Sequence, residues 1–234
     1  MENWSVKDAL TVLDEIDKRI SVIEAIRKLS SDKTADELHV LHPLIASARW
    51  IFGPEFDSPE YSYNNQLQTT VEKVFGKKVN KDLFINSRKR PDIVVIGEST
   101  FSITGINDID NDNGLTYLKK VLIIELKRGG FKLGREERNQ AVGYIEDFGG
   151  CGSILGNPYI NAFVVGESFS EKVQPYQTIK NENQVEIGKV QICLFSQIVD
   201  SAEKRLFNLR KRLNDRYSEL TGYELAEQQL KLVI

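Results

Sequence analysis

The chain is expected to fold as a mixed α/β domain, in which a small β-sheet is flanked by helices. Three observations predict this class: a helical period at the start, short aliphatic runs from about residue 92 onward, and charged helical stretches between and after those runs. The 234 residues are 41% hydrophobic and 28% charged, which suffices for one sizeable core. A single domain with accessory helices is the simplest organisation.

The first element is predicted to be a helix over residues 5–29. Leu13, Ile16, Ile20 and Ile23 follow one another at spacings of three and four, which places an apolar seam on one side of the helix. We favour a helix packed on its own domain over an intermolecular coiled coil, because the repeat lasts for fewer than four heptads.

A polar break at residues 30–34 divides the chain into two predicted parts. Residues 1–34 form an N-terminal helical segment, and residues 35–234 form the main domain, which opens with a second helix. The stretch 50–63 is expected to be an ordered loop, because two prolines interrupt any regular element there. A short helix is expected at about 64–75.

From about residue 92 the hydrophobic period becomes that of strands. Strands are predicted at 92–96, within 121–130, at 160–166 and at 189–195, and helices at 134–148 and 197–220. The polar stretch that ends in residues 107–114 is expected to be an excursion between the first two strands. This order of elements predicts a mixed sheet with helices around it.

The stretch 121–130, VLIIELKRGG, ends in two opposite charges. Side chains alternate faces along a strand, so Glu125 and Lys127 point the same way, while Leu126 joins the apolar face. Asp92 opens the preceding strand, and it lies beside Glu125 if the two strands pair as a hairpin.

This set of two acids and a lysine predicts metal-assisted phosphodiester hydrolysis. Two neighbouring carboxylates repel each other unless a cation lies between them. Mg²⁺ binds one or two carboxylates and keeps waters and room for a phosphate oxygen. A lysine beside it can orient or deprotonate a water. The alternative for Glu125 and Lys127 is an ordinary ion pair at the end of a strand, exposed to solvent.

The same residues resemble a known nuclease signature. Pro91-Asp92, followed after 33 residues by Glu125-Leu126-Lys127 between two β-forming runs, resembles the PD-(D/E)xK motif. With the following helix, which carries Gln140 and Tyr144, the stretch 88–148 is similar to the nuclease domain of Shedu-type bacterial anti-phage proteins. One departure is Gly129-Gly130, where relatives commonly have a proline.

The resemblance, which extends over about 35–215, implies a fold, an activity and a site. The fold is restriction-endonuclease-like: a mixed central sheet flanked by helices, here with an extra N-terminal helix. The activity is that of a Mg²⁺-dependent DNA endonuclease in anti-phage defence, with Mn²⁺ as a possible substitute and RNA not excluded. The implied catalytic residues are Asp92, Glu125, Lys127, Gln140 and Glu37. The implied metal ligands are Asp92, Glu125 and the Leu126 carbonyl.

Basic residues flank the motif, although the formal net charge of the chain is −3. Their clustering favours phosphate contact over an ordinary solvated face. The expected nucleic-acid contacts are Arg90, Arg128, Lys132, Arg135 and Arg138. Glu37 and Gln140 keep simpler alternatives, as a first-turn helix residue and as a surface glutamine respectively.

Two other functions remain open at this point. The chain can be a catalytically silent nucleic-acid-binding or assembly module of the same fold, or a regulatory subunit in which helix 5–29 mediates oligomerisation. Relatives imply a homodimer or homotetramer. The sequence begins without a signal peptide and contains no apolar run of the roughly 20 residues that a membrane span needs. A cytoplasmic protein with no membrane partner is therefore expected.

Two further patterns imitate metal sites. His39 and His42 are three residues apart, but two histidines make an incomplete site, and packing is the better interpretation. Asp108 belongs to a run of alternating acids that resembles a calcium loop, but Lys119 stands where the bidentate acid is needed. A solvated hairpin tip is expected there.

Overall fold

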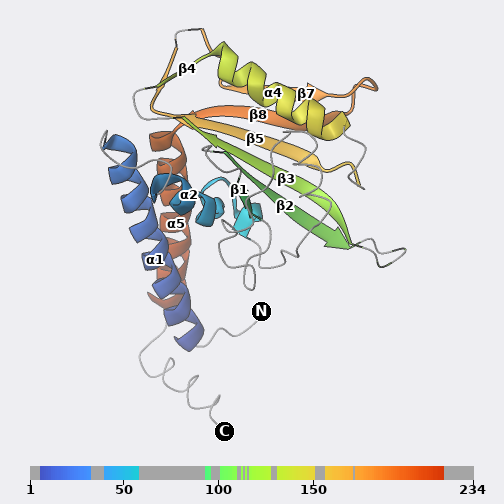
Figure 1. Ribbon diagram of the computed structural model, residues 1–234. Helices are drawn as coiled ribbons and strands as arrows, with labels where there is room; N and C mark the ends of the chain where they lie inside the picture. The colour runs from blue at the N-terminus through green and yellow to red at the C-terminus, as the bar shows by residue number, and fades with distance from the viewer. Residues whose placement is uncertain are drawn as a thin grey trace.

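The computed structural model describes residues 6–32, 40–57, 93–95, 101–109, 112, 114, 116–127, 131–150, 156–170 and 172–218. These residues form a mixed six-stranded sheet with one helix on one face and several helices on the other (Figure 1). The predicted α/β class is confirmed at this level.

The long helices lie where the hydrophobic period predicts them. The helices are α1 (Val6–Ser31), α2 (His42–Ser47), α4 (Arg135–Gly150) and α5 (Phe195–Ser218), with the 3₁₀ helices η2 (Arg49–Ile51) and η3 (Pro54–Asp57). The η3 turn occupies part of the stretch that was expected to be a loop, and its first residue is a proline, which suits a helix start. The short helix expected at 64–75 lies outside the described residues. None of the described helices is long and apolar enough to cross a bilayer.

The strands comprise one large sheet and one small pair. They are β1 (Ile93–Val95), β2 (Phe101–Ile109), β3 (Thr116–Leu126), β4 (Lys132–Leu133), β5 (Tyr159–Gly166), β6 (Ser168–Phe169), β7 (Tyr176–Lys180) and β8 (Glu186–Leu194). The large sheet has the order β1-β2-β3-β5-β8-β7, and β4 pairs with β6. The strands β3, β5 and β8 are parallel, whereas β1, β2 and β7 join their neighbours in antiparallel fashion.

The expectation of a polar excursion between the first two strands is wrong. Residues 101–109 form β2, which lies between β1 and β3 and pairs with both. Ile93 pairs with Thr104, which in turn pairs with Leu122 on β3. The direct hairpin between the strand after Asp92 and the strand of Glu125 is therefore also wrong.

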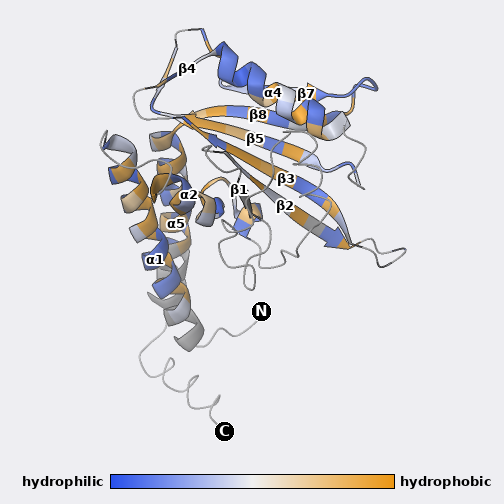
Figure 2. Cartoon of the chain, in the orientation of Figure 1, coloured by the Kyte–Doolittle hydropathy of each residue, from blue (hydrophilic) through white to orange (hydrophobic). Residues whose placement is uncertain are grey.

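The sheet separates two cores (Figure 2). On one face, Ile123 of β3 and Val164 of β5 pack with Ile145 and Phe148 of α4. On the other face, the helices α1, α2 and α5 cover Leu122, Ile124 and Leu126 of β3 together with residues of β5. Full burial of one such aliphatic side chain stabilises the fold by about 1.5–3 kcal/mol.

Helix α1 belongs to the second core. Its residues Ile16, Ile23 and Ile26 are at most 2% exposed and pack in the same cluster as Val199 and Ala202 of α5. The interpretation of a helix packed on its own chain is confirmed. The predicted division at residue 34 falls on residues outside the described ranges, but α1 shares its core with the main domain.

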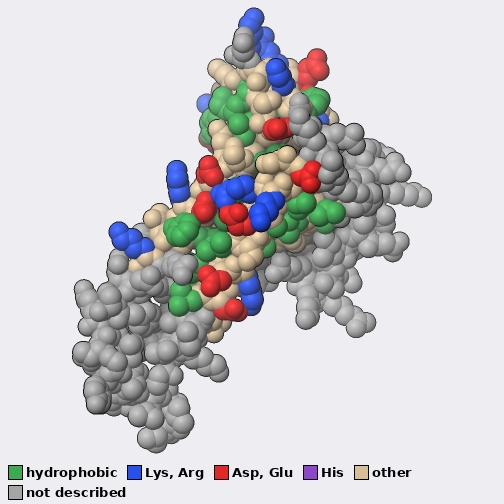
Figure 3. Space-filling view, turned by 90° about the vertical axis from the view of Figure 1, so that its left-hand side faces the viewer, with side chains coloured by type: hydrophobic (Ala, Val, Ile, Leu, Met, Phe, Trp, Pro, Cys, Tyr) green, Lys and Arg blue, Asp and Glu red, His purple; other side chains and the backbone are tan. Residues whose placement is uncertain are grey.

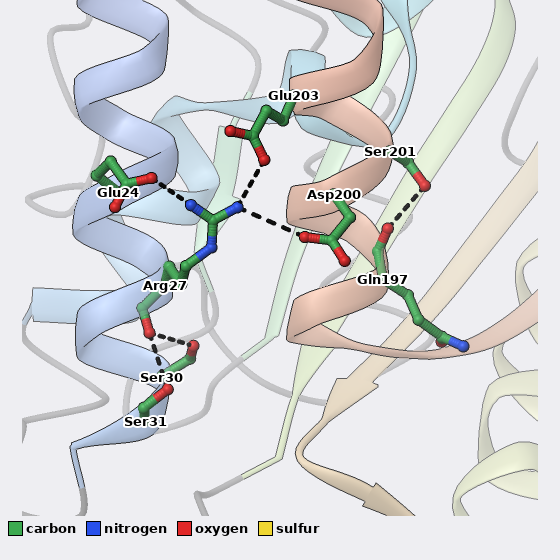
Figure 4. Close-up of polar contacts among 8 residues, drawn as sticks. All are labelled: Glu24, Arg27, Ser30, Ser31, Gln197, Asp200, Ser201 and Glu203. Atoms are coloured by element: carbon green, nitrogen blue, oxygen red, sulfur yellow. Dashed lines mark hydrogen bonds and ion pairs between the residues drawn. The ribbon is translucent and has the colours of Figure 1, made fainter.

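Charged side chains lie along the junction of α1 and α5 (Figure 4). Arg27 of α1 donates to Glu203 of α5 at 2.8 Å and lies 3.5 Å from Asp200, and it also pairs with Glu24 of its own helix. Acidic and basic groups are interspersed on the α1 side of the molecule (Figure 3). The cations of this junction are thus neutralised inside the chain.

Candidate functional site

The two charged residues of the motif lie at the C-terminal end of β3. Glu125 pairs with Val164 of the parallel strand β5, and the Lys127 amide continues the pattern by donating to the Val165 carbonyl at 2.8 Å. Val121 and Ile123 belong to the core under α4, whereas Leu126 belongs to the opposite core. The pleat therefore turns Glu125 and Lys127 toward the α4 side, as the sequence predicts.

Glu125 and Lys127 form a largely buried ion pair. Lys127 Nζ lies 2.7 Å from Glu125 Oε1, and the two side chains are 22% and 10% exposed, respectively. The alternative of a solvent-exposed pair at a strand end is wrong for Glu125. A buried pair stabilises a fold poorly unless its remaining hydrogen-bonding atoms are also satisfied.

The second oxygen of Glu125 is not satisfied by the described part of the chain. Glu125 Oε2 is buried and has no hydrogen-bond partner among the described residues. Leaving such an acceptor without a partner costs about 1–3 kcal/mol, and more when it is charged. A buried, unpartnered carboxylate oxygen beside a lysine is therefore a place where a cation or a donor from a ligand would be stabilising.

Helix α4 adds two polar side chains at this point. Gln140 and Tyr144 are four residues apart and share one side of the helix, and the Gln140 amide donates to the Tyr144 hydroxyl. Burial, and after it the negative charge of Glu125, raise the pKa of Tyr144 to about 12. Tyr144 is therefore a neutral phenol at physiological pH, hydrogen-bonded to Gln140 and within electrostatic range of Glu125.

The role of Gln140 at the site stays a prediction, and its link to the pair runs through Tyr144. Tyr144 is absent from the predicted catalytic set. The signal that could have added it is the spacing of four from Gln140, which puts both residues on one helix face.

Helix α4 is held at its N-terminus by local contacts. The Gly134 amide donates to Glu137 Oε2 at 2.8 Å, which is the glutamate half of a capping box. The Ser170 amide donates to the Leu133 carbonyl at 2.8 Å, next to the pairing of β4 with β6. A Cβ on Gly166 would lie 2.9 Å from Leu133 Cγ, so glycine allows Leu133 to close over the end of β5.

Three of the predicted basic contacts surround this N-terminus. Lys132 and Arg135 are exposed and Arg138 is half-buried. Arg135 donates to the Lys172 carbonyl at 3.4 Å and Arg138 to the Asn139 side chain at 3.1 Å. None of the three has an ion-pair partner among the described residues. The same first turn also carries Glu136 and Glu137, so it is the positive end of the helix dipole that would favour an anionic ligand there.

Four predicted site residues lie outside the described ranges: Asp92, Glu37, Arg90 and Arg128. The described neighbour of Asp92 is Ile93. Across the sheet, Ile93 is level with Thr104 of β2 and then with Leu122 of β3, which is three residues before Glu125. Three residues along a strand and two strands across place the Ile93 and Glu125 Cα atoms roughly 14 Å apart. The end of β1, Val95, is nearer to the level of Glu125 than its start.

The described residues contain no group of three His, Cys, Asp or Glu side chains that could hold a metal ion together. Glu125 alone fits a divalent cation in part, because its buried Oε2 is an unused anionic oxygen donor of the kind that Mg²⁺ prefers. The Leu126 carbonyl and the Asp92 carboxylate remain predicted ligands.

The two patterns that imitate metal sites have other roles. Asp108 on β2 forms an ion pair with Lys119 on β3, and this pair lowers the pKa of the Asp108 carboxyl. His42 lies in α2, on the opposite side of the sheet from Glu125, and is 1% exposed. Burial lowers the pKa of His42 to about 4, so the imidazole is neutral at physiological pH. His39 lies outside the described residues.

Comparison with known proteins adds no relative. No protein-family model, no curated protein and no solved structure matches this chain.

Proposed function

We propose that the chain is a metal-dependent nuclease that hydrolyses phosphodiester bonds in DNA. The observation that carries the proposal is the buried Glu125 carboxylate, which has one oxygen paired with Lys127 and the other without a partner. Such an arrangement is unfavourable in an unliganded protein, and it matches the charge pattern that phosphodiester hydrolysis requires.

Each residue has a role that follows from its position. Glu125 Oε2 would hold the cation; Asp92 is the second acid that the resemblance implies, although the Cα atoms of its neighbour Ile93 and of Glu125 lie roughly 14 Å apart. A bound Mg²⁺ or Mn²⁺ supplies a Lewis acid for the phosphate oxygen and a more acidic water. Lys127 is oriented by Glu125 Oε1, so that its ammonium group can position the attacking water and offset charge that develops on the phosphate. Tyr144 stays protonated and, with Gln140, supports this site from α4.

The fold and the sequence resemblance support the same proposal. The described sheet is mixed and has helices on both faces, which is compatible with a restriction-endonuclease-like domain. The unpaired basic groups at the start of α4 suit a phosphate backbone next to the site. A role in anti-phage defence, a cytoplasmic location and DNA rather than RNA as the substrate belong to the proposal through the Shedu-type resemblance.

A cleavage assay with matched variants tests this proposal. Supercoiled, linear and single-stranded DNA are incubated with the full chain in Mg²⁺, Mn²⁺ or EDTA. Glu125→Gln and Lys127→Gln should each reduce cleavage by roughly 100-fold or more, the range that a lost catalytic acid or base produces. Asp108→Asn and Lys119→Gln change the same groups in the exposed hairpin pair, and should leave the rate unaltered.

Circular dichroism and thermal unfolding verify that each variant is folded. Cleavage that persists in folded Glu125→Gln, or that continues in EDTA, would rule out the proposed mechanism. RNA of the same sequence, offered in parallel, decides the substrate.

A second candidate is a catalytically silent nucleic-acid-binding module. It is favoured by the register of the sheet, in which the Cα atoms of Ile93, next to Asp92, and of Glu125 lie roughly 14 Å apart. This candidate expects no cleavage with any metal, together with DNA binding that is the same in EDTA and in Glu125→Gln. The cleavage assay in Mg²⁺, Mn²⁺ and EDTA, repeated as a DNA-binding measurement with Glu125→Gln, separates the two candidates.

Assembly into a homodimer or homotetramer also remains a proposal. Deleting residues 1–30 is a poor test, because Ile16, Ile23 and Ile26 of α1 fill the shared core and their loss would unfold it. Light scattering of the full chain over a range of concentrations measures the oligomer directly. A monomer at all concentrations would exclude stable assembly.

A further inference from the structure

The second half of α5 carries a concentrated positive charge. Residues 204–212 read KRLFNLRKR, with five lysines or arginines and no acid, in a chain whose net charge is −3. This segment lies where α1 and α5 extend past the sheet (Figure 1), away from α4. The proposed active site does not use it.

Within this segment, three described side chains form an exposed stripe, which we call the α5 stripe: Lys204, Phe207 and Lys211. They are three and four residues apart and therefore share one side of the helix, and all three are exposed, Phe207 by 49%. Neither lysine has an ion-pair partner among the described residues. The lysines are about 10 Å apart along the helix axis, with the aromatic ring between them.

The neighbouring arginine has a different task. Arg205 donates to the carbonyls of Trp50 and Ile51 at 3.2 and 2.7 Å, which ties α5 to η2. Burial lowers the pKa of its guanidinium from the ordinary value. The basic side chains that the structure describes in this segment therefore divide into a structural tie, Arg205, and the lysines of the α5 stripe.

A lipid surface fits the α5 stripe poorly. The apolar side of α5, with Val199, Ala202 and Leu206, is already buried in the core. Among the described side chains of α5, the other exposed large apolar one is Leu209, which is about 200° around the helix from Phe207, so the two do not form a continuous face for insertion. One aromatic ring between two free ammonium groups instead fits a nucleic-acid strand, in which a base stacks on the ring and phosphates flank it.

We propose that the α5 stripe is a second nucleic-acid contact, which binds a single strand through Phe207 stacking and through Lys204 and Lys211. This inference rests on the proposed function only in that nucleic acid is the partner. The α5 contact does not depend on cleavage. The contact is separate from the basic groups of α4, and it lets the molecule hold an unpaired strand outside the site where cleavage occurs.

The test is fluorescence anisotropy of the full chain with labelled single-stranded DNA of about 30 nucleotides in EDTA, at several salt concentrations. Lys204→Gln/Lys211→Gln should weaken binding and lower the slope of log affinity against log salt by about 1.4. Phe207→Ala should weaken single-strand binding by about fivefold or more. Lys28→Gln/Lys180→Gln removes two other exposed, unpaired lysines and should change neither quantity.

Every outcome decides the proposal. Unchanged binding in the α5 variants overturns it, and if Lys132→Gln/Arg135→Gln/Arg138→Gln still reduces binding, the proposed function survives that failure. Loss of binding to anionic vesicles of phosphatidylserine in the α5 variants, with unchanged DNA binding, identifies a lipid contact and overturns it. A change in mass by light scattering in Phe207→Ala, with unchanged DNA binding, identifies contact with a second copy and also overturns it.

Discussion

The two faces of the sheet handle charge in opposite ways. On the α1 and α5 side, Arg19 and Arg27 each contact at least two carboxylates, and Arg19 also lies 5.0 Å from the centre of the Trp50 ring. On the α4 side, Glu125 keeps one oxygen without a partner among the described residues, and the basic groups at the start of α4 form no ion pair with a described acid.

This difference separates structural charge from charge that is available to a ligand. An ion pair that satisfies all its partners positions helices and contributes modestly to stability. A buried charge that is only partly satisfied lowers stability, and such a group is common where a ligand later completes its contacts. On the α4 side, Glu125 is therefore a charge that a ligand could complete, whereas Arg19 and Arg27 hold the helices of the α1 side together.

The largest expected effect comes from breaking the buried pair. Lys127→Met leaves the Glu125 carboxylate buried without its counter-ion, and should lower the free energy of unfolding by about 3–5 kcal/mol. Lys127→Met/Glu125→Gln removes the charge that was left alone, and should recover most of that loss. Urea denaturation of the wild type and of both variants measures the two steps.

Suppose that the double variant is as unstable as Lys127→Met. The loss of stability would then come from packing and not from the buried charge, which would contradict the interpretation of the α4 side. Lys119→Met is a useful control, because the partner of Lys119, Asp108, is 40% exposed. Loss of this exposed ion pair should change the free energy of unfolding little.

The elements found from the sequence are those with a clear period. Helices α1, α4 and α5 and strands β5 and β8 have continuous apolar faces, so hydrophobic spacing locates them. Strand β2 was missed because its buried positions include Ser102 and Thr104. The Thr104 hydroxyl accepts a hydrogen bond from the buried Arg49 at 3.4 Å, a long-range partner that no local pattern reveals.

The same limit applies to the site. The alternation of strand β3 predicts that Glu125 and Lys127 share a face, and the structure agrees. The alternation of apolar and polar side chains does not reveal the order of strands in a sheet, so the sequence could not show that β2 separates β1 from β3. The position of α4 over Glu125 likewise depends on tertiary packing, and it brings Tyr144 to the pair.

An intermediate effect on stability is expected from lowering the pH, through His42 on the α1 side of the sheet. His42 is buried in α2, its Nε2 has no hydrogen-bond partner among the described residues, and burial lowers its pKa from 6.5 to about 4. Between these two values the unfolded chain binds the proton more tightly than the folded chain. Stability due to neutral His42 is therefore complete above about pH 6.5 and falls as the pH drops toward 4, by about 2–3 kcal/mol in total.

His42→Leu isolates this contribution from that of the carboxylates. The variant should still lose the stability that depends on the titration of the other groups. Its unfolding free energy should, however, change less steeply with pH between 6.5 and 4. Equal slopes in the two proteins would mean that His42 is not a source of acid sensitivity.

The smallest effect is expected at the junction of α1 and α5, although Arg27 contacts three carboxylates there. The Arg27 side chain is 37% exposed and that of Asp200 is 59% exposed, so water screens much of the attraction. Arg27→Met keeps the packing of the alkyl chain and should lower the free energy of unfolding by less than about 1 kcal/mol. The difference from the wild type should shrink further between about 0.1 and 1 M salt, because screening weakens exposed pairs. A salt-independent loss as large as that of Lys127→Met would show that charge on the two faces is not divided into structural and available groups, because a fully partnered exposed arginine would then matter as much as a buried, half-partnered pair.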